Sequence, residues 1–172
     1  MREIRTKRLL LRKLRKDDAE SIFRNWASDS EVAKYVTWNA HKDINETKAI
    51  LDMWLAEYDN CYRYGIENKA DRELIGMIDV VGYHHGNPVI GYCSCRRYWG
   101  NGYMTEALGA VMKELEEDGF DTFVIEAAKD NVASNRVIEK NGFQLVGKRE
   151  DRLSEMKPQV VTINSYRYYV EK

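Results

Sequence analysis

The sequence has little of several features that mark particular classes of protein. Its 172 residues include only two prolines and three cysteines, and the formal net charge is −1. The cysteines are odd in number, and a single residue separates Cys93 from Cys95, which argues against a disulfide scaffold. We therefore interpret the cysteines as ordinary buried or surface thiols without a redox role.

Metal, nucleic-acid and membrane binding are disfavoured by other absences. The three histidines, His41, His84 and His85, form no H-x3-H pattern and no C-x2-C pair is present, so we expect no metal site. The near-zero net charge supplies no positive field to gather nucleic acid. No run approaches the roughly 18 to 20 apolar residues of a membrane-spanning helix, and the first ten residues are charged throughout. We expect a cytoplasmic protein that binds neither nucleic acid nor membrane.

The chain does carry enough apolar sequence to fold. Hydrophobic residues make up 44% of it, and at this length a single domain buries most of its apolar surface. No repeat, linker or low-complexity segment interrupts the sequence. Residues 1–172 are therefore interpreted as one domain.

The N-terminal third is predicted to be a strand followed by helices. A strand is expected at 8–14, and the apolar residues of 19–26 have the spacing of a helix with one buried face, capped by Asp17 or Asp18. Ser28, with a glutamate three residues on, predicts a capping box for a short second helix. Asp43, again with a glutamate three residues on, predicts the same for a third helix.

The rest of the chain alternates between strand-like and helix-like periods. Segments 61–67 and 73–83 are β-branched and aromatic runs around a polar turn, which predicts an antiparallel hairpin. Further strands are expected at 89–95, 122–128, 143–150 and 159–170, with helices after residue 102 and within 131–143. The β-α-β unit over 89–128 requires a right-handed crossover between parallel strands. The pattern is mixed α/β.

A G-x-G pair, Gly100 and Gly102, joins one of those strands to the long helix. The first turn of a helix leaves amide groups without partners and carries a partial positive charge, so bare backbone there can bind an anion. A P-loop would need a lysine after the second glycine, and a dinucleotide fingerprint would need Gly or Ala where Thr105 stands. Taken alone, a turn that merely joins strand to helix explains the glycines equally well.

A second motif lies one strand later, in NVASNRVIEKNGF. Asn131 is a suitable N-cap, Gly142 marks the C-terminal stop and Phe143 can make the closing hydrophobic contact. Alone, this segment indicates only a well-capped surface helix. Its combination with R-x-x-G-x-G is much more specific.

Together the motifs resemble the GNAT superfamily of acyl-CoA-dependent N-acetyltransferases, and within it the branch of the RimJ and RimL ribosomal-protein N-acetyltransferases. The resemblance covers nearly the whole chain, through TKRLLLRKLRKDDAESIF, YVTW, GYCSCRRYWGNGYMTEAL and NVASNRVIEKNGF. It implies an α/β (α+β) fold with a mixed, mainly antiparallel central sheet, helices on both faces and a parallel, splayed strand pair at the coenzyme site.

The resemblance also implies acetyl-CoA as cosubstrate. In GNAT proteins the Q/R-x-x-G-x-G/A turn binds the pyrophosphate, and pantetheine lies along the preceding strand, where a backbone N–H stabilises the oxyanion. The residues carried over to coenzyme binding are Tyr92, Cys93, Ser94, Arg97, Trp99, Gly100, Asn101, Gly102, Tyr103, Met104 and Asn131. This branch often has Gln or Arg just before the first glycine, where this sequence has Trp99; a side-chain contact to phosphate is lost, but the Trp99 backbone N–H is still expected to serve, with the amides up to Met104.

For catalysis, the resemblance implies direct transfer of acetyl to a primary amine in a ternary complex. Many members place a tyrosine general acid seven residues after the motif asparagine, but here that residue is Ile138. Ser134 matches a serine of the RimL-type pattern that protonates the departing thiolate. The alternative is a first-turn serine bonded to backbone or coenzyme. No general base stands out.

The acceptor stays open at this point. Trp38 and His41 are candidate substrate-side residues, with aromatic packing as the alternative. Protein N-termini, polyamines, amino acids and antibiotics are all acceptors within related branches. Exposed strand edges in this fold often pair between subunits, which adds a homodimer to the expectations. Ile138 and the missing base also admit a coenzyme-A-binding sensor or interaction protein that has lost transfer activity.

Overall fold

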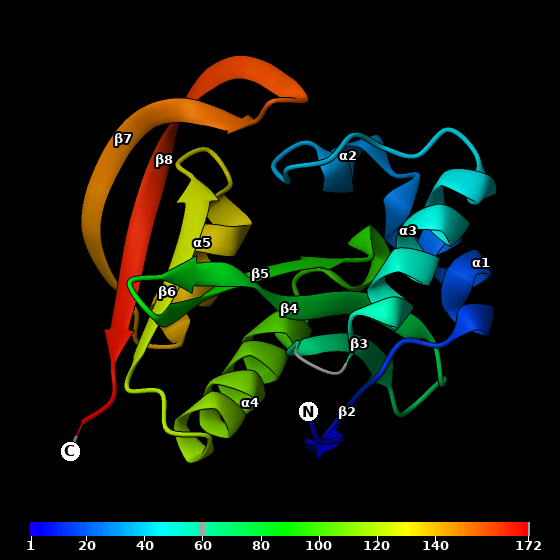
Figure 1. The fold of residues 1–172 in the computed structure, drawn as a ribbon, viewed down its shortest axis with the longest axis horizontal. Coiled ribbons are helices and arrows are strands. Elements are labelled where there is room, and N and C mark those ends of the chain that lie inside the picture. The colour runs from blue at the N-terminus through cyan, green and yellow to red at the C-terminus, as the bar shows by residue number, and fades with distance from the viewer. Residues whose placement is uncertain (59–60, 172) are drawn as a thin grey trace.

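Eight strands form one sheet in the computed structural model, which describes residues 1–58 and 61–171. The strands are β1 (Ile4–Arg5), β2 (Leu9–Arg12), β3 (Arg63–Asn68), β4 (Leu74–His84), β5 (Asn87–Ser94), β6 (Thr122–Ala128), β7 (Gln144–Ser154) and β8 (Lys157–Tyr169). Their order across the sheet is β1-β2-β3-β4-β5-β6-β8-β7 (Figure 1). Every neighbouring pair is antiparallel except β5 and β6, which confirms the mixed, mainly antiparallel sheet.

Helices cover both faces of this sheet. They are η1 (Lys16–Asp18), α1 (Ala19–Ile22), η2 (Phe23–Ala27), α2 (Ser30–Ala33), α3 (Ile44–Ala56), η4 (Arg96–Tyr98), α4 (Tyr103–Glu117) and α5 (Val132–Lys140). Met77 packs into the core formed with α1 and α3, whereas its neighbour Ile78 packs into the core formed with α4 and α5. Successive side chains of a strand point to opposite faces, so the two cores lie on opposite sides of the sheet. None of the described helices is long and apolar enough to cross a membrane.

The predicted crossover is present, and the two parallel strands that it connects, β5 and β6, diverge from each other. The helix α4 joins β5 to the parallel strand β6, and Val89 and Val124 are the only register pair between the two strands among the described residues. Beyond that pair, the edge of β5 that faces β6 carries no ladder partner from β6. The separation opens the sheet at the C-terminal end of β5, where α4 begins. This is the end at which open α/β sheets bind ligands.

One predicted helix cap is displaced by one residue. The N-cap of α2 is Asp29, whose side chain accepts from the Glu31 amide, whereas the Ser28 hydroxyl donates to the Phe23 carbonyl. Ser28 ends the π-helix η2 with helical backbone, so Asp29 is the first residue extended enough to cap. Asp18, one of the two residues predicted to cap the first helix, does occupy the N-cap position of α1, but its side chain makes no capping hydrogen bond there and instead accepts from the Arg15 amide and the Arg12 guanidinium.

The third predicted helix start is partly confirmed. Asp43 is the N-cap of α3 and accepts from the Asn45 amide at 2.6 Å. The carboxylate of Glu46, however, accepts from the amide of Lys42 at 3.3 Å rather than from that of Asp43. The reciprocal half of the capping box is therefore shifted by one residue.

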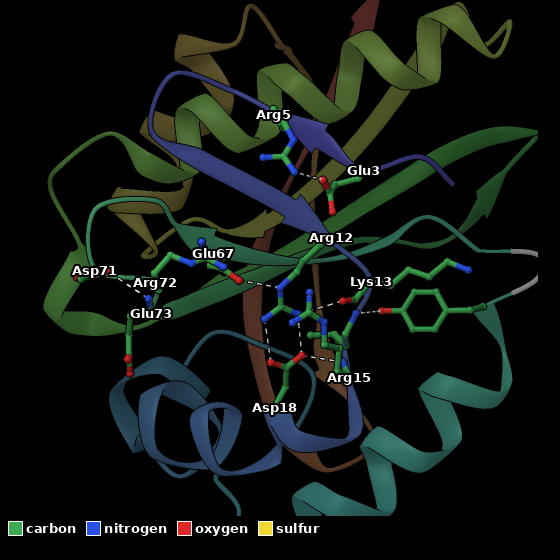
Figure 2. A network of polar contacts seen from close by, with 12 residues as sticks. Glu3, Arg5, Arg12, Lys13, Arg15, Asp18, Glu67, Asp71, Arg72 and Glu73 are labelled. Atoms are coloured by element: carbon green, nitrogen blue, oxygen red, sulfur yellow. Dashed lines mark hydrogen bonds and ion pairs between the residues drawn. The ribbon is translucent and has the colours of Figure 1, made fainter.

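A buried hydrogen-bond network around Arg12 connects β2 to η1 and β3 (Figure 2). The guanidinium of Arg12 donates to both carboxylate oxygens of Asp18 at 2.9 Å and to Glu67 at 2.8 Å. The side chains of all three are under 10% exposed. Arg72 makes a further ion pair with Glu67. Each buried charge therefore has a partner of opposite sign, as burial of charge requires.

The C-terminal strands form a long hairpin, β7–β8, that arches away from the rest of the sheet and returns over it (Figure 1). It extends beyond the strands predicted at 143–150 and 159–170. Near its tip the Ser154 hydroxyl donates to the Thr37 carbonyl, and the Lys157 ammonium donates to the Ala33 carbonyl, each at 2.6 Å. The hairpin tip is thereby fixed to the segment around α2.

Candidate active site

The glycine turn before α4 is built as the sequence predicts. Gly100 and Gly102 have φ angles of +77° and +76°, in the left-handed region that favours glycine. A Cβ at Gly100 would meet no atom within 4 Å, so the turn faces open space. The first intrahelical bond of α4 runs from the Glu106 amide to the Gly102 carbonyl, which leaves the amides of Tyr103, Met104 and Thr105 for an external acceptor. A phosphate fits such a cradle.

The turn is held in place by the N-terminal segment. The carboxylate of Glu106 accepts from the Thr6 hydroxyl at 2.6 Å, from the Arg8 amide at 2.9 Å and from Arg8 Nε at 2.7 Å. Arg8 Nη1 also donates to the Asn101 carbonyl at 2.9 Å, and its guanidinium lies over the Tyr103 ring. Partial burial raises the pKa of Glu106, but the hydrogen bonds from Thr6 and Arg8 outweigh it and leave this pKa below its ordinary value.

The amide of Trp99 is not free, contrary to the prediction. It donates to the Arg96 carbonyl at 3.1 Å and so closes the 3-10 turn η4. The indole Nε1 of Trp99 instead donates to the Ser94 carbonyl at 3.0 Å, and the side chain folds back over the end of β5. Trp99 thus covers the end of the strand and contributes no amide to the anion cradle.

The exposed edge of β5 presents Tyr92, Cys93 and Ser94 to the gap beside β6. The Tyr92 side chain lies on the α5 side of the sheet, and the Cys93 side chain lies on the α1–α3 side. Burial raises the pKa of the Cys93 thiol well above its ordinary value. Because only a thiolate is an effective nucleophile, Cys93 is unsuited to a covalent acetyl-enzyme.

The start of α5 faces the same gap. Asn131 is its N-cap and accepts from the Ser134 amide at 3.3 Å, as predicted. Ser134 is half-buried, and its Oγ lies 2.9 Å from the Tyr92 hydroxyl. Two helix N-termini, those of α4 and α5, therefore converge on the end of β5.

These elements enclose a cavity of about 530 Å³. Ten of the predicted site residues line it: Tyr92, Cys93, Ser94, Trp99, Gly100, Gly102, Tyr103, Met104, Asn131 and Ser134. It also extends to α2, so a single space joins the anion cradle, the edge of β5 and the helical layer on the other side of the sheet. The arrangement suits a long ligand that carries phosphate at one end and reacts at the other.

The other four predicted site residues do not line the cavity. Arg97 is exposed and its guanidinium lies over the ring of Tyr98, because η4 turns it outwards. The Asn101 amide group bonds back to the carbonyls of the turn itself. The ring centroids of Trp38 and His41 lie 5.8 Å apart with the ring planes tilted by 52°, and His41 Nδ1 lies 2.7 Å from the Thr47 hydroxyl on α3. Contacts with neighbouring side chains therefore account for the positions of Trp38 and His41.

Sequence reasoning missed the polar residues on two walls of the cavity. Glu31, Lys34 and Tyr35 approach from α2 and the residues after it, and Arg136 and Lys140 approach from α5. The α5 pair had a signal in the sequence, because Arg136 and Lys140 are spaced i, i+4 and therefore share one face of the helix. The α2 wall had none, since its place is fixed by contacts distant in sequence, such as the 3.1 Å ion pair between Arg96 and Asp29.

Comparison with known proteins agrees with this geometry. A family model described as the acetyltransferase (GNAT) domain matches residues 8–144. The chain is 32% identical over 152 residues to the uncharacterized N-acetyltransferase YoaA of Bacillus subtilis (strain 168), covering 84% of each.

Solved structures share the fold at lower identity. A GNAT-family acetyltransferase from Bacillus anthracis superposes with a TM-score of 0.86 at 22% identity over 98% of both chains. RimL, the ribosomal L7/L12 alpha-N-protein acetyltransferase solved with coenzyme A, gives a TM-score of 0.82 at 20% identity, also over 98% of both. Because the family model matches residues 8–144 and the chain is 32% identical to YoaA, the chain belongs to the GNAT family of acetyltransferases.

Proposed function

We propose that the protein transfers an acetyl group from acetyl-CoA to a primary amine by direct attack, and that the amine is the N-terminus of a protein. The observation that carries this proposal is that the anion cradle at the start of α4, the open edge of β5 and Ser134 all border one cavity. A phosphate-bearing thioester needs all three: an anion site, a backbone hydrogen-bond donor and a proton source.

The chain's own groups suffice to bind and orient the coenzyme. The amides at the start of α4 receive the pyrophosphate, with the helix dipole in their favour. When bound, acetyl-CoA supplies an activated acetyl group as a thioester. The unpaired N–H groups of β5 around Cys93 polarise its carbonyl, an effect worth a few kcal/mol in comparable sites.

Ser134 is proposed as the group that protonates the departing thiolate. Its hydroxyl lines the cavity at the start of α5, close to the edge of β5. Ile138, the residue in the position of the commoner tyrosine acid, is fully buried and apolar, so it offers no proton. The neutral Cys93 leaves direct attack by the amine as the route of transfer.

A protein N-terminus is favoured by the acceptor side of the cavity and by the likeness to RimL. The walls there come from α2 and carry Glu31 and Tyr35, and the β7–β8 hairpin is fixed above them. A terminal amine has a pKa of about 8, so a fraction of it is already neutral near pH 7 and can react without a strong dedicated base.

The test is thiol release from acetyl-CoA with peptide N-termini, polyamines and amino acids as acceptors, with coenzyme affinity measured in parallel. We expect release with peptide N-termini. We expect Ser134→Ala to lower kcat by about 100-fold or more while the Kd for coenzyme A changes less than about threefold. Ser28→Ala, which removes a surface hydroxyl outside the cavity, is the control.

Three outcomes would contradict parts of the proposal. Release with small amines alone would reject the protein acceptor. Tight coenzyme binding without release on any amine would indicate a binding protein. Full activity of Ser134→Ala would remove Ser134 from the chemistry.

A further inference from the structure

The Ser134 hydroxyl has an unusual partner. A serine in a helix commonly bonds to a backbone carbonyl of the preceding turn. Here Ser134 Oγ lies 2.9 Å from the Tyr92 hydroxyl, which also lies 3.2 Å from the Ser134 carbonyl oxygen. The contact bridges β5 and α5 beside the cavity that both residues line.

This pair bears on a chemical difficulty of the proposed reaction. An alkanol is a far weaker acid than a thiol, so serine alone is poorly matched to protonate a thiolate of pKa about 8.5. A phenol, with an ordinary pKa of about 10, is a stronger acid than an alkanol and so a closer match. Ser134 becomes an adequate donor if a phenol replaces its proton as it is lost.

We propose that Tyr92 acts through Ser134 as the proton source for the leaving thiolate, in a relay of two hydroxyl groups. This rests on the proposed acetyl transfer. As the amine nitrogen bonds to the acetyl carbon, the carbon–sulfur bond breaks and its electron pair goes to sulfur. Sulfur takes the Ser134 proton, and Ser134 Oγ takes the Tyr92 proton. The phenolate is then reprotonated by the proton that the attacking nitrogen gives up, through solvent in the cavity.

The geometry allows the Tyr92 hydroxyl two alternative hydrogen bonds to Ser134. Tyr92 has one proton and two acceptors within reach, Ser134 Oγ and the Ser134 carbonyl oxygen. When it donates to Oγ, the serine proton is free to point into the cavity. When it donates to the carbonyl, the serine proton points back to the phenol. A ligand that accepts from Ser134 selects the first arrangement.

The surroundings keep the phenol protonated between turnovers. Tyr92 packs against the core on the α4–α5 side, its hydroxyl bonds to Ser134, and Tyr166 acts on it electrostatically. Burial raises the pKa of Tyr92, with only partial relief from the hydrogen bond to Ser134. The same burial makes Tyr92 a weaker acid than an ordinary phenol, so in the relay its proton moves together with that of Ser134 as the carbon–sulfur bond breaks, and no phenolate persists.

The test removes the hydroxyl and keeps the ring. For Tyr92→Phe we expect kcat to fall about 10- to 100-fold while the Kd for coenzyme A stays within about twofold, which also shows that the variant is folded. The matched control is Tyr62→Phe, which loses a surface hydroxyl bond to Asp118 and should keep full activity.

Two further readouts separate a relay from a purely structural role. In a double-mutant cycle, Tyr92→Phe should add less than about twofold to the loss caused by Ser134→Ala, because both groups act in one chain. In mixtures of H₂O and D₂O, kcat of the unaltered protein should depend on deuterium content with the curvature of two moving protons, and that of Tyr92→Phe should be linear.

Some outcomes would overturn the relay alone. They are normal kcat in Tyr92→Phe, a loss confined to KM, or losses that multiply with those of Ser134→Ala. Absence of thiol release by the unaltered protein would instead overturn the proposed transfer, and the relay with it.

Discussion

Gly100 illustrates how a single residue serves folding and binding in separable ways. Its φ of +77° costs a residue with a Cβ about 1–2 kcal/mol, whether or not a ligand is present. No atom lies within 4 Å of a Cβ at this position, so crowding inside the protein is not the reason for glycine. A Cβ would instead occupy space beside the cradle, where a phosphate must approach the amides.

Gly100→Ala is therefore expected to weaken coenzyme A binding by about tenfold or more, beyond its effect on stability. Gly119→Ala is the control: Gly119 has a φ of +95°, also faces open space, and lies past the far end of α4. Both variants should lose about 1 kcal/mol of unfolding free energy, but only Gly100→Ala should change the Kd measured by calorimetry. Equal Kd values in the two variants would place the phosphates elsewhere.

Among the secondary-structure elements, the turn between β1 and β2 is what steadies the start of α4. Thr6 and Arg8 in that turn hold Glu106, which lies in the first turn of the helix. The anion cradle is thus supported by residues about 100 positions away in sequence. This support depends on the charge of one carboxylate.

Glu106→Gln should lower the free energy of unfolding by about 2 kcal/mol at pH 7, because it weakens hydrogen bonds to a charged acceptor. The folded-state pKa of Glu106 lies below its ordinary value of 4.5. The stabilisation is therefore complete above pH 4.5 and is lost as pH falls through the lower folded pKa. Urea unfolding at several pH values should show the difference between variant and unaltered protein shrinking below pH 4.5. A difference constant down to pH 2 would contradict this, and Glu3→Gln, in an exposed pair with Arg5, should show none.

The Arg12 network joins β2, η1 and β3 (Figure 2). The hydrogen bonds that Arg12 donates to Asp18 and Glu67 outweigh the effect of burial and raise the pKa of its guanidinium, which therefore stays charged. Asp18→Asn would leave this buried charge with one carboxylate fewer. We expect a loss of about 3–5 kcal/mol in unfolding free energy by urea denaturation. Asp52→Asn, which breaks the exposed 3.9 Å pair with Lys16, should cost less than about 0.5 kcal/mol. Similarly small losses of unfolding free energy in both variants would show that the Arg12 network does not stabilise the fold.

For the molecule as a whole, local signals predicted more than long-range ones. The glycine turn before α4 and the Asn131 cap are encoded within a few residues, and the structure confirms them. The capping of α2 was misplaced because the π-helix η2 before it has no local sequence signature. Arg97 was carried into the site by its motif, but η4 turns it outwards.

The acceptor side of the cavity could not be predicted in the same way. Its wall is α2, and the position of α2 depends on Arg96, Ser154 and Lys157, which come from η4 and from the tip of the β7–β8 hairpin. No spacing within residues 28–36 reports these contacts. The bond between Tyr92 and Ser134 is likewise invisible in the sequence, because it crosses the gap between a strand and a helix 42 positions away.

The most direct test of the account is amide hydrogen exchange with and without acetyl-CoA. We expect the coenzyme to slow exchange in segments 92–105 and 131–135, which contribute the predicted coenzyme-binding residues of the cavity, and to leave the exposed strand β7 unchanged. Protection confined to other segments, or no protection at saturating acetyl-CoA, would contradict the assignment of this cavity as the acetyltransferase site.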